Sequence, residues 1–67
     1  MTDSPIAAVV RIAKKNGAKR VGSDAAEALV AKAEKFIAHL TKESNKLAAH
    51  AGRKTIKKED VELAARS

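Results

Sequence analysis

The 67-residue chain contains no cysteine, and Phe36 is its only aromatic residue. Disulfide bonds are therefore excluded, and the absence of cysteine suits an intracellular protein. His39 and His50 fall on different faces of one helical stretch, so we expect no intrachain metal site and no cofactor. A single aromatic side chain argues against the nucleic-acid-binding proteins that stack bases on several aromatic rings.

Long hydrophobic runs are also missing from the sequence. No stretch approaches the roughly 18 apolar residues of a membrane-spanning helix. No charged leader is followed by an apolar region, so we expect no signal peptide. These features predict a cytoplasmic protein that has no membrane partner.

Acidic residues are few relative to basic ones, with eight Asp and Glu against fourteen Lys and Arg and a net charge of +6. Such a basic bias in a small chain favours polyanionic partners. Residues 4–23 contain no acid at all. Nine of the fourteen basic residues form two clusters, which are Arg11, Lys14, Lys15, Lys19 and Arg20 in the first and Arg53, Lys54, Lys57 and Lys58 in the second.

Glycine and proline are absent from the 28 residues between Asp24 and Ala51. This stretch is rich in Ala, Leu, Glu and Lys, which predicts one long helix of about 42 Å. Its apolar residues recur at spacings of three and four and form one stripe. A chain this short cannot cover that stripe by folding back on itself, so we expect a second copy to cover it. The stripe comprises Leu29, Val30, Ala33, Phe36, Ile37, Leu40, Leu47, Ala48 and Ala51.

A shorter helix is predicted over residues 5–16. Ser4 or Asp3 can serve as its N-cap, and Pro5 suits its first helical position. Gly17 follows its apolar face and suits the left-handed position that ends many helices.

Residues 17–23 are predicted to form the first loop, with Val21 as its buried anchor. Asp24 and the acid three positions later resemble a capping box in which Asp24 is the cap. Ser23 or Gly22 can take that place instead, so the start of the long helix is defined only within two residues.

Residues 52–57 are predicted to form the second loop and residues 58–66 a third helix. Thr55 and Ile56 have β propensity and predict a very short strand within this loop. The acids that open the third helix, Glu59 and Asp60, match the helix dipole and indicate a helix start rather than a metal site. Residues 1–67 therefore read as one all-α domain of short, long and short helices.

The two basic clusters lie on loops at opposite ends of the long helix. If two long helices pair antiparallel, the first loop of one chain meets the second loop of the other. The clusters then merge into two composite basic patches, where backbone N–H groups can also bind phosphate oxygens. Dimerisation would therefore create the polyanion site.

Several motifs resemble the archaeal histones, and the resemblance spans essentially the whole chain. The most specific is the stretch His50–Ala64, supported by Pro5-Ile6-Ala7, Arg11-Ile12 and Gly17-Ala18-Lys19-Arg20-Val21. The resemblance implies a histone fold that dimerises in an antiparallel handshake, with Phe36 near its middle. The dimer core it implies comprises Leu29, Ala33, Phe36, Ile37 and Leu40.

The resemblance also implies that dimers bind, bend and compact duplex DNA on the chromosome, in the nucleoid. Wrapping DNA with minor-groove arginines is a known property of histones. Arg20 matches that arginine, and Thr55 matches the threonine that steadies it. The implied DNA-binding residues are Arg11, Lys14, Lys15, Lys19, Arg20, Arg53, Lys54, Thr55 and Lys57.

Assembly beyond the dimer is implied through a four-helix bundle in which Leu47, His50 and Asp60 match the interface positions. Asp60 also matches one partner of an internal ion pair with Arg53, and Gly17 matches a position where turns of the DNA superhelix approach. The chain departs from the family pattern at Ala8, Gly22 and Asn45, and many core positions are alanine. Because smaller core side chains stabilise packing less, we expect dimers to stack weakly into filaments.

Two other classes of function remain open at this point. The chain can be a histone-fold module whose partner is a related histone, forming a heterodimer instead of a homodimer. It can also be a basic amphipathic helix acting on anionic membranes, but its apolar stripe lacks Trp and most of its charge lies in the loops. An enzyme is not supported, because no nucleophile stands beside an oriented base.

Overall fold

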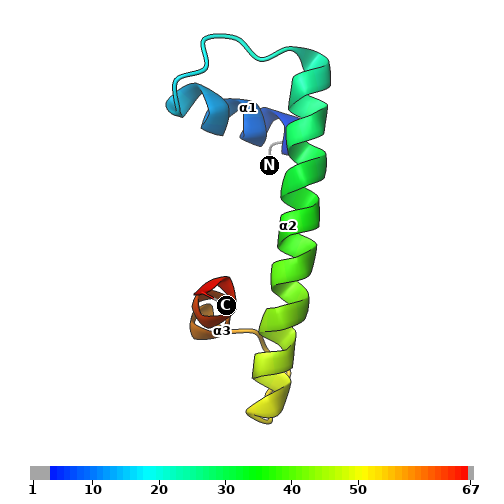
Figure 1. Ribbon diagram of the computed structural model, residues 1–67, viewed down its shortest axis with the longest axis vertical. Coiled ribbons are helices and arrows are strands. Elements are labelled where there is room, and N and C mark those ends of the chain that lie inside the picture. The colour runs from blue at the N-terminus through cyan, green and yellow to red at the C-terminus, as the bar shows by residue number, and fades with distance from the viewer. Residues whose placement is uncertain (1–3, 67) are drawn as a thin grey trace. The chain divides into compact units, whose positions relative to one another are not determined.

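The structure is a computed structural model that describes residues 4–66 and contains three helices (Figure 1). They are α1 (Pro5–Lys15), α2 (Ser23–His50) and α3 (Lys58–Arg66). Within these described residues there is no strand. The predicted all-α order of short, long and short helix is therefore confirmed.

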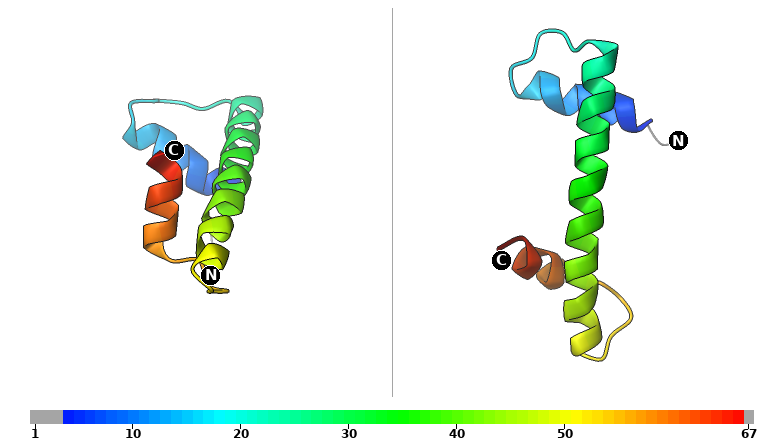
Figure 2. Two further views of the ribbon diagram at one scale, coloured as in Figure 1. Left: turned by 60° about the horizontal axis from the view of Figure 1, so that its bottom comes forward. Right: turned by 45° about the vertical axis from the view of Figure 1, so that its right-hand side comes forward.

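The chain forms two compact units, Met1–Glu34 and Lys35–Ser67, and α2 contributes to both. In the first unit, α1 lies beside the N-terminal part of α2 (Figures 1 and 2). In the second unit, α3 lies beside the C-terminal part of α2. Each unit is thus a pair of helices joined by one loop.

The N-terminal end of α1 is capped by Ser4, whose hydroxyl accepts a hydrogen bond from the backbone N–H of Ala7 at 3.1 Å. Pro5 occupies the first turn, where a missing N–H costs nothing. The structure thus selects Ser4 between the two predicted caps, and Asp3 lies outside the described residues.

The C-terminal ends of α1 and α2 are both closed by a glycine with a positive φ angle. α1 ends at Lys15, one residue earlier than predicted, because Asn16 is its cap. Gly17 (φ +106°) and Gly52 (φ +77°) then adopt positive φ angles that side chains rarely tolerate. Two backbone hydrogen bonds close each end. At α1, the N–H of Gly17 donates to Lys14 O (3.2 Å) and that of Ala18 to Ala13 O (3.1 Å). At α2, the N–H of Gly52 donates to Ala49 O (2.9 Å) and that of Arg53 to Ala48 O (2.9 Å).

The start of α2 differs from the predicted capping box. The helix begins at Ser23, and the carbonyl of Gly22 accepts the first helical bond, from Ala26 N–H at 2.9 Å. Asp24 therefore lies inside the first turn and accepts a bond from the adjacent Ala25 N–H at 2.8 Å. Of the three predicted candidates, Gly22 therefore takes the cap position, and the carboxylate of Asp24 complements the positive end of the helix dipole.

The second loop also differs from the prediction, because Thr55 and Ile56 do not form a strand. A strand needs a neighbouring backbone for its ladder, and a single chain offers none at this loop. Ile56 is instead half-buried against α2, and the Thr55 carbonyl accepts a bond from Arg53 at 3.1 Å.

The core of a single chain is very small. Among the described residues, only Ala26 and Ala48 are apolar and buried. Larger apolar side chains stay exposed, including Phe36 at 63% and Ile37 at 60%. A 63-residue described segment with so little buried apolar surface lacks the main driving force for folding alone.

Candidate functional site

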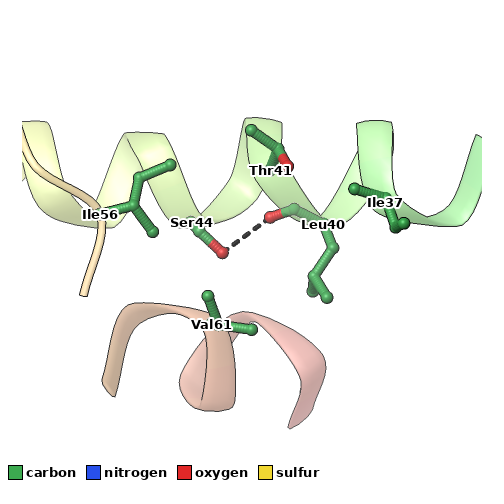
Figure 3. A pocket seen from close by; sticks show the side chains of 6 residues that line it. All are labelled: Ile37, Leu40, Thr41, Ser44, Ile56 and Val61. Carbon is green, nitrogen blue, oxygen red and sulfur yellow. Dashed lines mark hydrogen bonds between the residues drawn. The ribbon is translucent and has the colours of Figure 1, made fainter. Parts of the chain in front are cut away.

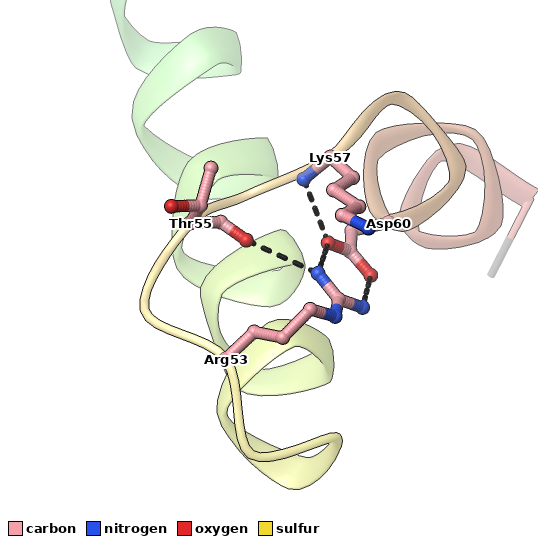
Figure 4. Close-up of polar contacts among 4 residues, drawn as sticks. All are labelled: Arg53, Thr55, Lys57 and Asp60. Carbon is pink, nitrogen blue, oxygen red and sulfur yellow. Dashed lines mark hydrogen bonds and ion pairs between the residues drawn. The ribbon is translucent and has the colours of Figure 1, made fainter.

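The second loop is held by a clasp between Arg53 and Asp60 (Figure 4). The guanidinium donates two parallel bonds to the carboxylate, at 2.8 and 2.9 Å, in the bidentate geometry that makes such pairs strong. The same carboxylate accepts a hydrogen bond from the backbone N–H of Lys57 at 2.8 Å, and this bond closes the first turn of α3. Asp60 is only 4% exposed, so the clasp lies largely out of solvent.

These contacts stabilise the charged form of Asp60. The hydrogen bond from Arg53 is the largest cause, followed by the bond from the Lys57 backbone, and together they lower the pKa of Asp60 from 3.8 to about 2. The hydrogen bond to Asp60 raises the pKa of Arg53 in turn. The predicted internal ion pair is therefore present.

Acid is expected to remove the stabilisation that this clasp provides. Because the pKa of Asp60 is lower in the folded chain, the contribution is fully present above pH 3.8 and is lost as the pH falls towards 2. We expect Asp60→Asn to show a smaller drop in thermal midpoint across this window than the wild type, measured by circular dichroism. Glu62→Gln, a matched change at an exposed acid of α3, should retain the full drop; an identical profile for both variants would count against the clasp.

The first basic cluster lies on the end of α1 and the loop that follows. Its members Arg11, Lys14, Lys15, Lys19 and Arg20 are all exposed. Val21 is only half-buried, and Ala18, which the sequence pattern did not single out, is half-buried with it. The predicted basic residues of the first cluster are thus exposed to solvent, while Ala18 and Val21 are the half-buried apolar residues of the loop.

The second basic cluster divides into two roles. Lys54, Lys57 and Lys58 are exposed, as is the uncharged Thr55 beside them, whereas Arg53 is half-buried and turned towards Asp60. Three of the five N–H groups of Arg53 are used by Asp60 and the Thr55 carbonyl. The structure therefore places Arg53 as the residue that shapes this loop.

An uncovered apolar hollow of about 280 Å³ lies in the first unit. Leu29 and Ala33, both predicted dimer-core residues, form one wall of this hollow. Ile12 of α1 forms another wall and is 59% exposed, although the sequence pattern alone assigned it no contact. Its spacing of three from Val9 was the signal that could have placed it on this face.

A second apolar hollow, of about 160 Å³, lies in the other unit, between α2, Ile56 and α3 (Figure 3). Ile37 and Leu40 of the predicted dimer core line it, together with Val61. Ser44 is fully buried in its wall and donates a hydrogen bond to the Leu40 carbonyl at 2.7 Å. Sequence reasoning missed Ser44 because a hydroxyl interrupts the apolar stripe, and only its spacing of four from Leu40 indicated the buried face.

The four residues predicted for larger assemblies have different surroundings. Leu47 is half-buried, His50 is exposed at the end of α2, and Asp60 is buried in the clasp. Gly17 is exposed, and its missing side chain leaves open space around it. Their roles between dimers stay predictions.

In the part of the chain that the structure describes, no helix combines the length and hydropathy needed to cross a membrane. No group of three or more His, Asp or Glu side chains in residues 4–66 is placed to hold a metal ion.

Comparison with known proteins gives consistent matches along the chain. The family model described as "Histone-like transcription factor (CBF/NF-Y) and archaeal histone" matches residues 3–65. One of the subunits of the archaeal histone HAN1 from Thermococcus zilligii is 45% identical over 67 residues, which cover 100% of both chains. "Probable archaeal histone 3" of Methanocaldococcus jannaschii is 42% identical over 66 residues, which cover 98% of both chains.

Proposed function

Because this chain belongs to the family of archaeal histones and histone-like transcription factors, we propose that it packages chromosomal DNA. Residues 1–67 act as one histone-fold domain, with no enzymatic activity. The observation that carries the proposal is the placement of exposed basic residues directly after the two glycine-terminated helix ends. In this reading the protein works at the chromosome, in the nucleoid.

The binding unit is an antiparallel homodimer. Each unit of the single chain leaves an apolar hollow open, and Phe36 and Ile37 of α2 are mostly exposed. A second copy that pairs its α2 with this face would cover these surfaces and supply the missing apolar burial. The dimer core is formed by Leu29, Ala33, Phe36, Ile37 and Leu40.

DNA binds at the two ends of this dimer, where the first loop of one chain meets the second loop of the other. The residues that contact phosphate are Arg11, Lys14, Lys15, Lys19, Arg53, Lys54 and Lys57. Arg20 enters the minor groove beside Thr55. Since these contacts are made to the backbone, binding depends little on base sequence and bends the duplex where it is flexible.

Replacement of Arg20 tests this assignment. Arg20→Ala removes two cationic contacts from each dimer, so we expect affinity for many duplexes to fall alike, by about tenfold at moderate salt. The slope of log affinity against log salt should decrease by roughly two. Fluorescence anisotropy on three unrelated duplexes, at four salt concentrations, measures both quantities.

Lys42→Ala is the matched control, because it also removes two cations from each dimer, but from the exposed side of α2 and not from either loop. It should leave the affinity within about twofold of the wild type and change the salt slope little. If Lys42→Ala and Arg20→Ala weaken binding equally, net charge and not the first loop determines the affinity, and the minor-groove assignment is wrong.

Dimers assemble further on DNA only weakly. Leu47, His50 and Asp60 form the contact between dimers, and Asn45 places an amide near that contact. Nuclease digestion of complexes on duplexes of increasing length tests this step. A single short protected size is the expected result, whereas a ladder that grows in regular steps would show a continuous filament.

A heterodimer is the second candidate for the binding unit, and one observation favours it. The name of the relative from Thermococcus zilligii describes it as one of the subunits of a histone, which marks that protein as part of an assembly. Analytical ultracentrifugation of the purified chain distinguishes the candidates. A dimer that persists at low micromolar concentration supports the homodimer, and a monomer without stable helices supports an obligate histone partner.

A further inference from the structure

The end of α1 carries an Asn-Gly pair, Asn16 and Gly17, in the middle of the first basic cluster. We propose that Asn16 is a site of spontaneous deamidation, that the C-terminal cap of α1 restrains this reaction, and that its product weakens DNA binding. The last part rests on the proposed function, whereas the first two depend only on the fold.

The chemistry requires only water and the neighbouring backbone. The backbone nitrogen of Gly17 loses its proton and attacks the side-chain carbonyl carbon of Asn16, forming a five-membered succinimide. The bond from that carbon to Nδ2 breaks, and ammonia leaves. Water then opens the ring at either carbonyl and yields aspartate or isoaspartate. Glycine favours the attack because it has no side chain to hinder the approach. In a single chain both residues are exposed to water, and Asn16 also borders the apolar hollow of the first unit.

The folded chain ties down both reacting groups. The side-chain amide of Asn16 donates a hydrogen bond from Nδ2 to the Ile12 carbonyl at 2.8 Å. The backbone N–H of Gly17 donates to the Lys14 carbonyl at 3.2 Å. Both bonds must open before nitrogen and carbon can meet. The reaction therefore depends on local opening of the last turn of α1, which is the kind of helix end that frays most readily.

The product reverses the local electrostatics. In the unmodified chain, the Asn16 amide donates to the Ile12 carbonyl at the negative end of the α1 dipole. An aspartate at this position has no Nδ2 donor, and its negative charge is repelled by the same carbonyl oxygen. The new carboxylate also lies within the first basic cluster, next to the last-turn cations Lys14 and Lys15. Each deamidated chain thus subtracts one unit from the positive charge that the loop offers to phosphate.

Peptide mapping by mass spectrometry of the purified full-length protein tests the first two parts. The wild type is incubated for about two weeks at pH 8 and 37 °C, which speed the reaction, in one sample with urea and in another without it. Deamidation is followed at each asparagine. We expect Asn16 to deamidate, and to do so at least about tenfold faster in urea than in the folded protein. Asn45, the chain's other asparagine, is followed by Lys46 inside α2 and serves as the internal control. Equal rates with and without urea would overturn the restraint by the cap, and faster reaction at Asn45 would overturn the site.

Two variants test the consequence for DNA. Asn16→Asp mimics the product, and Asn16→Gln keeps an amide at the same place. We expect Asn16→Asp to bind duplex DNA about tenfold more weakly at low salt and Asn16→Gln to stay within about twofold of the wild type. If Asn16→Asp binds like the wild type while Arg20→Ala is impaired, the effect of deamidation is refuted and the proposed function stands. If neither Asn16→Asp nor Arg20→Ala is impaired, the first loop is not the DNA site. If the wild type itself does not bind duplex DNA, the proposed function fails, while the mass measurement still decides whether Asn16 is the modified residue.

Discussion

Phe36→Lys is expected to abolish the dimer and, with it, most of the helical structure. The side chain is 63% exposed in a single chain. In the proposed homodimer it belongs to the core that the second copy covers. Losing a buried Phe costs about 3 kcal/mol, and a buried lysine adds a charge without a partner. Since each dimer contains two copies and every 1.4 kcal/mol is a factor of ten, the dissociation constant should rise by at least about a thousandfold.

Sedimentation equilibrium measures the dissociation constant, and far-ultraviolet circular dichroism measures helix content on the same samples. Ala38→Lys is the matched control: Ala38 lies three and four positions from Lys35 and Lys42, on the polar side of the same helix. It should leave the dimer intact. A stable, helical dimer of Phe36→Lys would show that the chains do not pair through this face.

The helices themselves could be predicted from sequence because their signals are local. The stretch without glycine or proline gave α2 to within one residue at each end, and Gly17 gave the end of α1. The uncovered stripe could be predicted from chain length, since the rest of so short a chain is too small to cover a helix of 28 residues. Phe36 and Ile37 are exposed for that reason.

Features that depend on neighbours distant in the sequence were harder to predict. Thr55 and Ile56 have the propensity for a strand, but a strand requires a second backbone. The conformation of the loop is fixed instead by the bond from Arg53 to the Thr55 carbonyl and by the contact of Ile56 with the apolar hollow. Ser44 is polar, yet it is fully buried in the hollow that Ile56 and Val61 also line, where its hydroxyl donates to the Leu40 carbonyl of its own helix. The Arg53–Asp60 pair was anticipated from family resemblance, and no rule of spacing would have joined two residues seven positions apart across a loop.

Asp60→Ala is expected to have the largest effect on the second unit. It removes both bonds to Arg53 and the acceptor for the Lys57 N–H, so one guanidinium and one helix-start donor lose their partners together. Removing one member of a buried ion pair is strongly destabilising, and we expect the thermal midpoint to fall by roughly 10 °C. DNA affinity should fall as well, because Lys54 and Thr55 lose the loop geometry that positions them. Glu59→Ala removes the same charge from the same turn at an exposed residue and should change both quantities little.

The combination of Arg53→Ala with Asp60→Ala distinguishes a shared clasp from two independent contributions. If the two residues act as a unit, the double variant loses less stability than the sum of the two single losses, because no unpaired charge remains. Additive losses would refute the clasp. His50→Ala separates the remaining role of Asp60: His50 is exposed and lies outside the clasp, so its loss should spare the thermal midpoint and reduce only assembly of dimers on long DNA. A fall in midpoint for His50→Ala would instead place this histidine within the fold of the second unit, and the contact between dimers would have to rest on Leu47 and Asp60.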